Sequence, residues 1–157
     1  MDGYLAVKLL HILSSTVLFG TGLGTAFFML RAWQSKSDEA MRVTTAHVVQ
    51  ADWLFTTPAV VVQLATGLWL TSQIGISYLS LWFAVVITLF ALVGACWLPV
   101  VWIQIHIRNL IGKGVEPSQY RRLMRWWMAL GIPAFLAVLA LFVLMVYKPW
   151  VGIMLFN

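Results

Sequence analysis

The sequence predicts an all-α membrane protein, a bundle of four transmembrane helices that forms a single integral membrane domain over residues 1–157. Of the 157 residues, 62% are hydrophobic and only 10% are charged, whereas soluble domains are about 45–50% apolar and about 25% charged. Four apolar segments also reach the roughly 20 residues that a helix needs to cross a bilayer. Backbone groups cannot stay unpaired in lipid, and the segments lack the alternation of barrel strands, so they are expected to be helices.

Each of the four helices is placed by its apolar run and by the residues that bound it. The first begins near Tyr4 and is longer than the apolar core of a signal peptide, so we expect it to stay in the mature chain. The second crosses the membrane from about Asp52, and Ser37 followed by two acids is typical of a helix start, so we expect this helix to extend on the cytoplasmic side. An uncharged turn separates it from the third helix. The expected bounds are about residues 4–30, 37–73, 78–108 and 118–147.

The basic residues predict the orientation. Eight of the ten Lys and Arg residues fall in the first and third connections, and cytoplasmic loops are the ones enriched in Lys and Arg. We therefore expect both basic connections in the cytoplasm and both termini outside, in a multi-pass protein of the bacterial inner membrane. The net charge is +5. The basic residues behind it lie between apolar spans and not on one face of a soluble fold, so no nucleic-acid partner is expected. The surrounding partner is the lipid bilayer.

Three histidines are the candidate functional residues, because an ionisable side chain within a membrane is a functional candidate by default. His11 lies about two turns into the first span, and Ser14 and Gly22 fall roughly on its face of the helix. This pattern suits a porphyrin lying along the helix, and the alternative is a histidine hydrogen-bonded to a neighbouring helix. Gly20 and Gly24 either pack closely against another helix or leave a groove for a flat cofactor.

His47 and His106 are predicted at nearly equal depth near the cytoplasmic interface, where they could meet. His11 lies about 20 Å away in depth, near the level of Val60 and Ala91, so it cannot share one iron with His47 within a subunit. A haem at His11 would define one site, and the inner pair a second; the alternative for the pair is a solvated or structural role. Asp52 and Gln104 could orient the pair, as hydrogen-bonding partners of metal-bound histidines do, or Asp52 could be a helix-end charge.

The types of residue present restrict which metals the chain could bind. No Cys or carboxylate cluster accompanies the histidines, which argues against a closed zinc site, whereas imidazole suits iron and copper. The histidines therefore leave iron, as in a haem, and copper as the candidate metals, with ligands drawn from His11, His47 and His106. Gly22 is a further predicted cofactor-binding residue. Arg122 belongs to a basic run that either anchors the topology or holds haem propionates or anionic lipid headgroups.

Several segments carry a resemblance that covers nearly the whole chain. The sequence resembles the bacterial domain-of-unknown-function 2269 family, which implies a four-helix membrane protein and no assigned function. The matching segments are YLAVKLLHIL (residues 4–13), FGTGLGTAFF (19–28), HVVQADWLF (47–55), PAVVVQ (58–63), TGL (66–68) and GACWLPVVW (94–102).

A weaker resemblance is to the HemJ-type protoporphyrinogen oxidases. It is carried by KLLHI at residues 8–12, by PA at 58–59 and by TGLWL at 66–70. That family binds haem b through the first-helix histidine, so the resemblance implies His11 as the ligand. The family has a functional lysine near the start of its third helix, where this sequence reads LWFAV at residues 81–85.

These observations predict a b-type haem protein that transfers electrons in the membrane, to or from quinone or a redox partner protein. The alternatives are a HemJ-like porphyrinogen oxidase, and a non-catalytic membrane subunit or copper-handling protein. A single chain of this size exposes much small-residue helix surface, which favours a homodimer.

Overall fold

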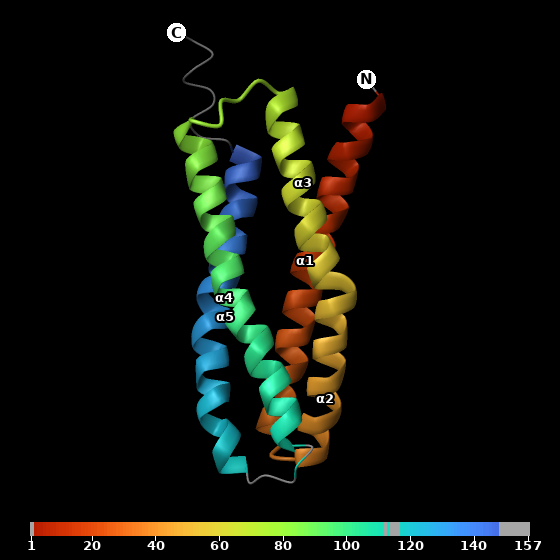
Figure 1. The fold of residues 1–157 in the computed structure, drawn as a ribbon, viewed down its shortest axis with the longest axis vertical. Helices are drawn as coiled ribbons and strands as arrows, with labels where there is room; N and C mark the ends of the chain where they lie inside the picture. The colour runs from red at the N-terminus through yellow and green to blue at the C-terminus, as the bar shows by residue number, and fades with distance from the viewer. Residues whose placement is uncertain (1, 112, 114–116, 148–157) are drawn as a thin grey trace.

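The computed structural model describes residues 2–111, 113 and 117–147, which form an elongated bundle of helices (Figure 1). The described residues contain no strand, and four of their helical stretches are long and apolar enough to cross a membrane. The predicted all-α bundle of four membrane-spanning helices is thereby confirmed. The elements, in chain order, are α1 (Asp2–Gln34), α2 (Asp38–Ala51), the π-helix η1 (Asp52–Thr56), α3 (Thr57–Gln73), α4 (Leu81–Ile111) and α5 (Pro117–Tyr147).

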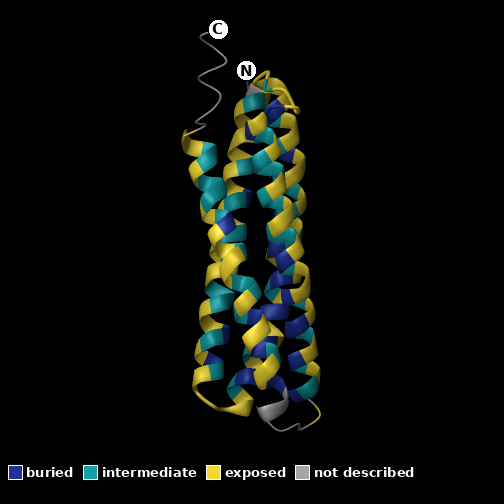
Figure 2. Ribbon diagram, turned by 90° about the vertical axis from the view of Figure 1, so that its left-hand side faces the viewer, coloured by how far each residue is buried: buried dark blue, intermediate teal, exposed yellow. Residues whose placement is uncertain are grey.

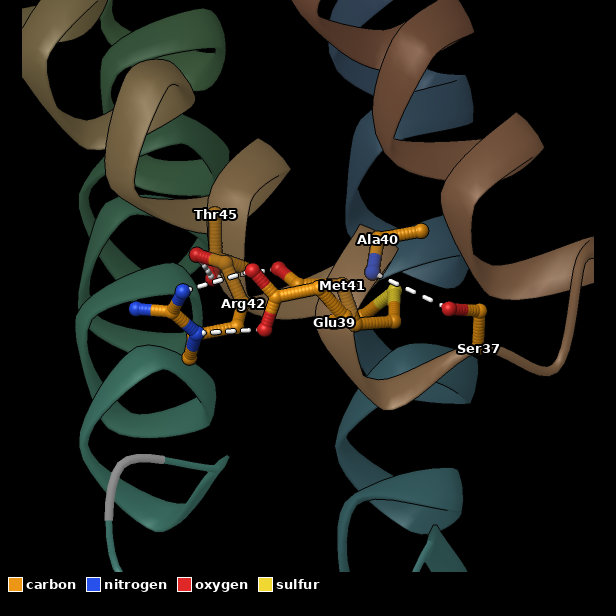
Figure 3. Close-up of polar contacts among 6 residues, drawn as sticks. All are labelled: Ser37, Glu39, Ala40, Met41, Arg42 and Thr45. Atoms are coloured by element: carbon orange, nitrogen blue, oxygen red, sulfur yellow. Dashed lines mark hydrogen bonds and ion pairs between the residues drawn. The ribbon is translucent and has the colours of Figure 1, made fainter.

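The second crossing is extended as predicted, because α2 begins directly after Ser37. The Ser37 hydroxyl oxygen accepts the Ala40 N–H at 3.2 Å and so caps the helix (Figure 3). One turn on, Glu39 and Arg42 form an exposed ion pair at 2.6 Å. The other predicted bounds differ by a few residues: α1 continues past Leu30 to Gln34, and α4 runs from Leu81 to Ile111.

Pro58 accounts for the π-helix within the second crossing. Its ring nitrogen carries no hydrogen, so the carbonyl group of Leu54 loses its α-helical partner. The preceding turn is wider, and the Thr57 N–H reaches the Asp52 carbonyl oxygen five residues back. The Thr57 hydroxyl donates to the same oxygen at 2.9 Å. The hydrogen-bonding pattern of the crossing therefore changes from α to π at Asp52, and the helix continues.

The two ends of the bundle differ in charge. The connection from α1 to α2, the end of α4 and the start of α5 lie at one end, here called the basic end (Figure 1). The start of α1, the connection from α3 to α4 and the end of α5 lie at the other, here called the terminal end. The charges predicted this grouping, and the assignment of the basic end to the cytoplasm stays a prediction.

The tight hydrophobic core lies toward the basic end (Figure 2). There α2 packs against both α1 and α4, while α4 packs against α5. Toward the terminal end the helices lie in two pairs, α1 with α3 and α4 with α5. Phe19 of α1 reaches the second pair, with ring centroids 5.5 Å from those of Phe135 and Phe142. The most deeply buried side chains belong to the basic-end core and its border: Met29, Met41, Thr45, Ile107 and Met124.

Candidate functional site

His11 lies in a polar cluster between α1 and α3, toward the terminal end. Its Nδ1 is 2.8 Å from the Thr66 hydroxyl oxygen, and its Nε2 is 2.9 Å from the Gln63 side-chain nitrogen. The Ser14 hydroxyl donates to the Gln63 side-chain oxygen at 2.6 Å. Ser14 and Thr66 are buried, while His11 and Gln63 are half-buried. These four residues, the histidine cluster, join the two helices through polar groups within an apolar span.

The hydrogen bonds of the histidine cluster fix the tautomer of His11. The Thr66 hydroxyl oxygen lies 2.6 Å from the Val62 carbonyl oxygen, and two oxygens this close need a proton between them. Because the Thr66 proton is committed to Val62, the Thr66 oxygen must accept the proton of His11 Nδ1. His11 Nε2 is then unprotonated and accepts from the Gln63 amide. The imidazole thus presents a lone pair on Nε2.

Gly67 allows the imidazole to lie where it does. A β-carbon at Gly67 would stand 3.2 Å from His11 Cε1, which is closer than ordinary van der Waals contact between carbon atoms. Any side chain here would press on the edge of the ring. The α3 backbone therefore forms one wall of the histidine cluster.

The sequence left two roles open for His11, and the hydrogen bonds to α3 correspond to the structural one. The cofactor-ligand role stays a prediction, because the Nε2 lone pair that would bind a metal accepts the Gln63 amide in this structure. The depth estimate had put His11 level with Val60. Its partners Gln63 and Thr66 lie about one turn closer to the terminal end.

Gly20, Gly22 and Gly24 of α1 do not pack against another helix in the described part of the chain. A β-carbon at Gly20, Gly22 or Gly24 would have no atom of another element within 4 Å. The expectation of close helix packing at Gly20 and Gly24 is therefore wrong within a single chain. Gly22 lies on an open face of α1, and its predicted role in cofactor binding stays a prediction.

The two inner histidines are both exposed. His47 borders a groove between α1 and α2, together with Thr25, Phe28 and Thr44. His106 stacks on Trp102 of its own helix, with ring centroids 5.0 Å apart and an interplanar angle of 11°. The described residues contain no hydrogen bond between the two histidines and no group of three or more His, Cys, Asp or Glu side chains placed to hold a metal ion. A shared site on His47 and His106 stays a prediction.

Asp52 and Gln104 bond to each other and not to the histidines, which corrects the orienting role expected for them. The Asp52 carboxylate accepts from the Thr56 hydroxyl at 2.9 Å and from the Gln104 side-chain nitrogen at 2.9 Å. The Gln104 side-chain oxygen in turn accepts from Trp127 Nε1 at 3.2 Å. This amide orientation follows from its neighbours, because the indole can only donate. The four residues, here called the carboxylate layer, connect η1, α4 and α5.

Arg122 lies far from His11. It is exposed near the start of α5, five residues before Trp127 on the way to the basic end. With Trp127 level with Asp52, the 1.5 Å rise per residue puts Arg122 about 25 Å from the level of the histidine cluster. A haem on His11 therefore has no contact with Arg122 of the same chain, and the role of Arg122 as a haem-propionate or lipid ligand stays a prediction for the basic end alone.

Sequence reasoning missed the partners of His11 on α3. Gln63 and Thr66 are spaced three residues apart in an otherwise apolar helix, and that spacing puts both on one helix face. This pattern was a usable signal. Trp127 offered no such signal, because its neighbour Trp126 is the same residue type and only the fold shows that Trp127 is buried while Trp126 is exposed.

Comparisons with known proteins bear on the family alone. No curated protein and no solved structure matches the chain. One family model matches residues 5–149, and it describes a predicted integral membrane protein (DUF2269). Together with the four spanning helices, this match establishes that the chain belongs to this family, domain of unknown function 2269, as a multi-pass integral membrane protein.

Proposed function

We propose that this protein is a b-type haem-binding redox protein of the bacterial inner membrane, with His11 as the axial ligand. The observation that carries the proposal is the tautomer of His11. The Thr66 hydroxyl oxygen accepts the proton on His11 Nδ1, so Nε2 carries the lone pair. Haem-ligating and metal-ligating histidines are held in this way, with the other ring nitrogen donating to a fixed oxygen.

One donor of the histidine cluster, Gln63, must move before His11 can bind haem. The Gln63 amide donates to Nε2 and so stands where an iron ion would be bound. Its oxygen is held by Ser14, so Gln63 must turn away for His11 to bind a metal. Thr66 would keep the imidazole plane fixed, and Gly67 would leave room for it. When bound, haem supplies one-electron transfer, and the chain supplies the ligand, its orientation and an apolar surrounding.

The proposed electron partner is a quinone or a redox protein in the same membrane. The open face of α1 that carries Gly20 and Gly24 provides a contact surface for a second copy of the chain, because glycines four residues apart let two helices approach closely in lipid. A homodimer is therefore part of the proposal.

The absorption spectrum of the purified protein tests the proposal. We expect a Soret band after expression with haem supplementation, and the His11→Ala variant should lose most of it. His106→Ala separates this site from the predicted inner site. It should keep the band of the His11 site, because His106 stacks on its own helix and shares no partner with His11. A protein without a Soret band, or with bound copper in its place, would show that the haem proposal is wrong.

The porphyrinogen oxidase reaction is the less favoured alternative. The resemblance places the functional lysine of that family near the start of α4, where this chain has Trp82 and its neighbours. Trp82 is buried, and its indole nitrogen donates to the Leu144 carbonyl oxygen at 3.1 Å. The Trp82 indole supplies no amine in place of that lysine. We therefore expect that expression of this protein will not restore growth to a strain that lacks its own protoporphyrinogen oxidase.

A further inference from the structure

Asp52 is a buried carboxylate without a cationic partner. Its exposed fraction is 4%, and it lies within the second membrane crossing. The ion pair found in the described residues joins Arg42 to Glu39 and leaves Asp52 out. An unpaired carboxylate inside a membrane protein costs several kcal/mol, and such residues in known membrane proteins belong to ion pathways and proton relays.

The atoms around the Asp52 carboxylate are hydrogen-bond donors. Thr56 donates to Oδ1 and Gln104 donates to Oδ2, and the indole of Trp97 on α4 is a further donor beside the carboxylate. Because the Trp127 indole can only donate, the Gln104 oxygen must face Trp127 and its nitrogen must face Asp52. A metal ion bound to Asp52 would need further oxygen ligands, and here it would meet the hydrogens of the Gln104 amide. These donors stabilise the ionised carboxylate and leave no oxygen ligands for a metal ion, so the cation that this site can take up is a proton.

The π-helix gives an independent reason to regard Asp52 as functional. Single π-turns inside α-helices occur often at functional sites, and η1 begins at Asp52. The Asp52 carbonyl oxygen accepts from both the Thr57 N–H and the Thr57 hydroxyl. The backbone of Asp52 is thus held by its own helix while its side chain bonds to α4.

We propose that Asp52 is a proton-binding site in the membrane-spanning bundle and that the proton binds at Oδ1. The step is the addition of one proton to the carboxylate, which gives the neutral acid. At Oδ1 the Thr56 hydroxyl can rotate and change from donor to acceptor. At Oδ2 the Gln104 amide cannot make this change while Trp127 donates to its oxygen. Trp127 is then a positioning residue, because it acts on Asp52 through Gln104.

No other titratable group competes with Asp52 for this proton within the carboxylate layer. On α1 the chain has no titratable residue between His11 and Arg31. The nearest basic groups along α2, α4 and α5 are exposed, unlike Asp52: His47, His106 and Arg125. The thiol of Cys96 on α4 is the other buried titratable group near this level. The proton site is also independent of the haem proposal, because Asp52 shares no partner with His11.

Infrared difference spectroscopy of the full chain in lipid nanodiscs tests this site without any cofactor. Spectra recorded over a pH titration should show one carboxyl carbonyl band that appears on protonation and is shielded from rapid deuterium exchange. Asp52→Asn should remove the band. Asp38→Asn is the matched control and should keep it, because Asp38 is exposed. A wild-type titration without a shielded band, or a band that persists in Asp52→Asn, overturns the proposal.

The two adjacent tryptophans provide a second test that leaves Asp52 in place. In Trp127→Phe the Gln104 amide is free to turn and accept from the protonated acid, so the titration midpoint of the band should move to higher pH by about one unit. Trp126→Phe should leave the midpoint unchanged, because Trp126 is exposed. Equal shifts in the two variants would contradict the positioning role, and this comparison decides the matter even if Asp52→Asn does not fold.

Discussion

At the scale of single residues, two glycines of the spanning helices have opposite surroundings. Gly67 faces His11, where a β-carbon would stand 3.2 Å from the ring, whereas Gly22 faces open space. Replacing a helix-interior glycine by alanine lowers the entropy of the unfolded chain and stabilises a helix by roughly 0.5–1 kcal/mol where the side chain fits. The same substitution therefore has different consequences at the two positions.

We expect Gly22→Ala to raise the resistance of the protein to denaturation and Gly67→Ala to lower it or leave it unchanged. In Gly67→Ala the imidazole must also move by a few tenths of an ångström, so this variant should retain less of the proposed haem. Thermal unfolding in detergent, followed with the Soret absorbance, measures both effects. A Gly67→Ala protein with full haem retention would contradict the close approach of α3 to His11.

At the scale of elements, the π-helix sets the rotation of α2 relative to α3. Its hydrogen bonds span five residues where an α-helix spans four, so η1 holds one residue more than a regular turn would. Buried residues of α2, before η1, face the basic-end core, and Thr66 of α3, after η1, faces His11. Removing the extra residue at η1 keeps these two faces in register, whereas removing a residue from α3 rotates one face against the other.

We therefore expect deletion of Leu54 to be tolerated and deletion of Val61 to abolish stable folding. Both side chains are exposed, at 61% and 63%, so neither deletion removes a buried contact. Size-exclusion chromatography in detergent and helix content by circular dichroism measure the outcome. If both deletions have the same effect, the π-turn does not hold an extra residue.

At the scale of the whole molecule, the basic end carries the packed core, and the terminal end consists of two helix pairs. Met124 is fully buried in that core, whereas Leu136 of the same helix is 58% exposed and faces outward. Replacing Met124 by alanine leaves a cavity that the neighbours cannot fill. The stability of the bundle should therefore depend far more on its basic end.

We expect Met124→Ala to lower the free energy of unfolding by about 2–5 kcal/mol. Leu136→Ala should change it much less, because lipid or detergent replaces the lost contacts. Titration with a denaturing detergent, followed by circular dichroism, gives both values. Similar losses in the two variants would contradict the placement of the core.

The helices and their order could be predicted from the sequence, because their cause is local: apolar runs of membrane length and a cap at Ser37. The partners of His11 and Asp52 could not, because they depend on which helices pair and how each is rotated. A depth estimate places a residue only to about one turn, so it put His11 near Val60 and not beside Gln63. The same estimate placed Asp52 beside the inner histidines. In the structure Asp52 bonds to Gln104, whose amide is oriented by Trp127, and neither this contact nor the π-helix can be predicted from composition.

The histidine cluster has a consequence for biosynthesis. His11 emerges from the ribosome before its partners Gln63 and Thr66, which lie 52 and 55 residues downstream. At a translation rate of about 5–20 residues per second, the first helix must wait about 3–11 s with a polar ring unpaired. The same interval separates Asp52 from Gln104, 52 residues apart. The polar side chains of the first two crossings therefore gain their partners only as later helices are made.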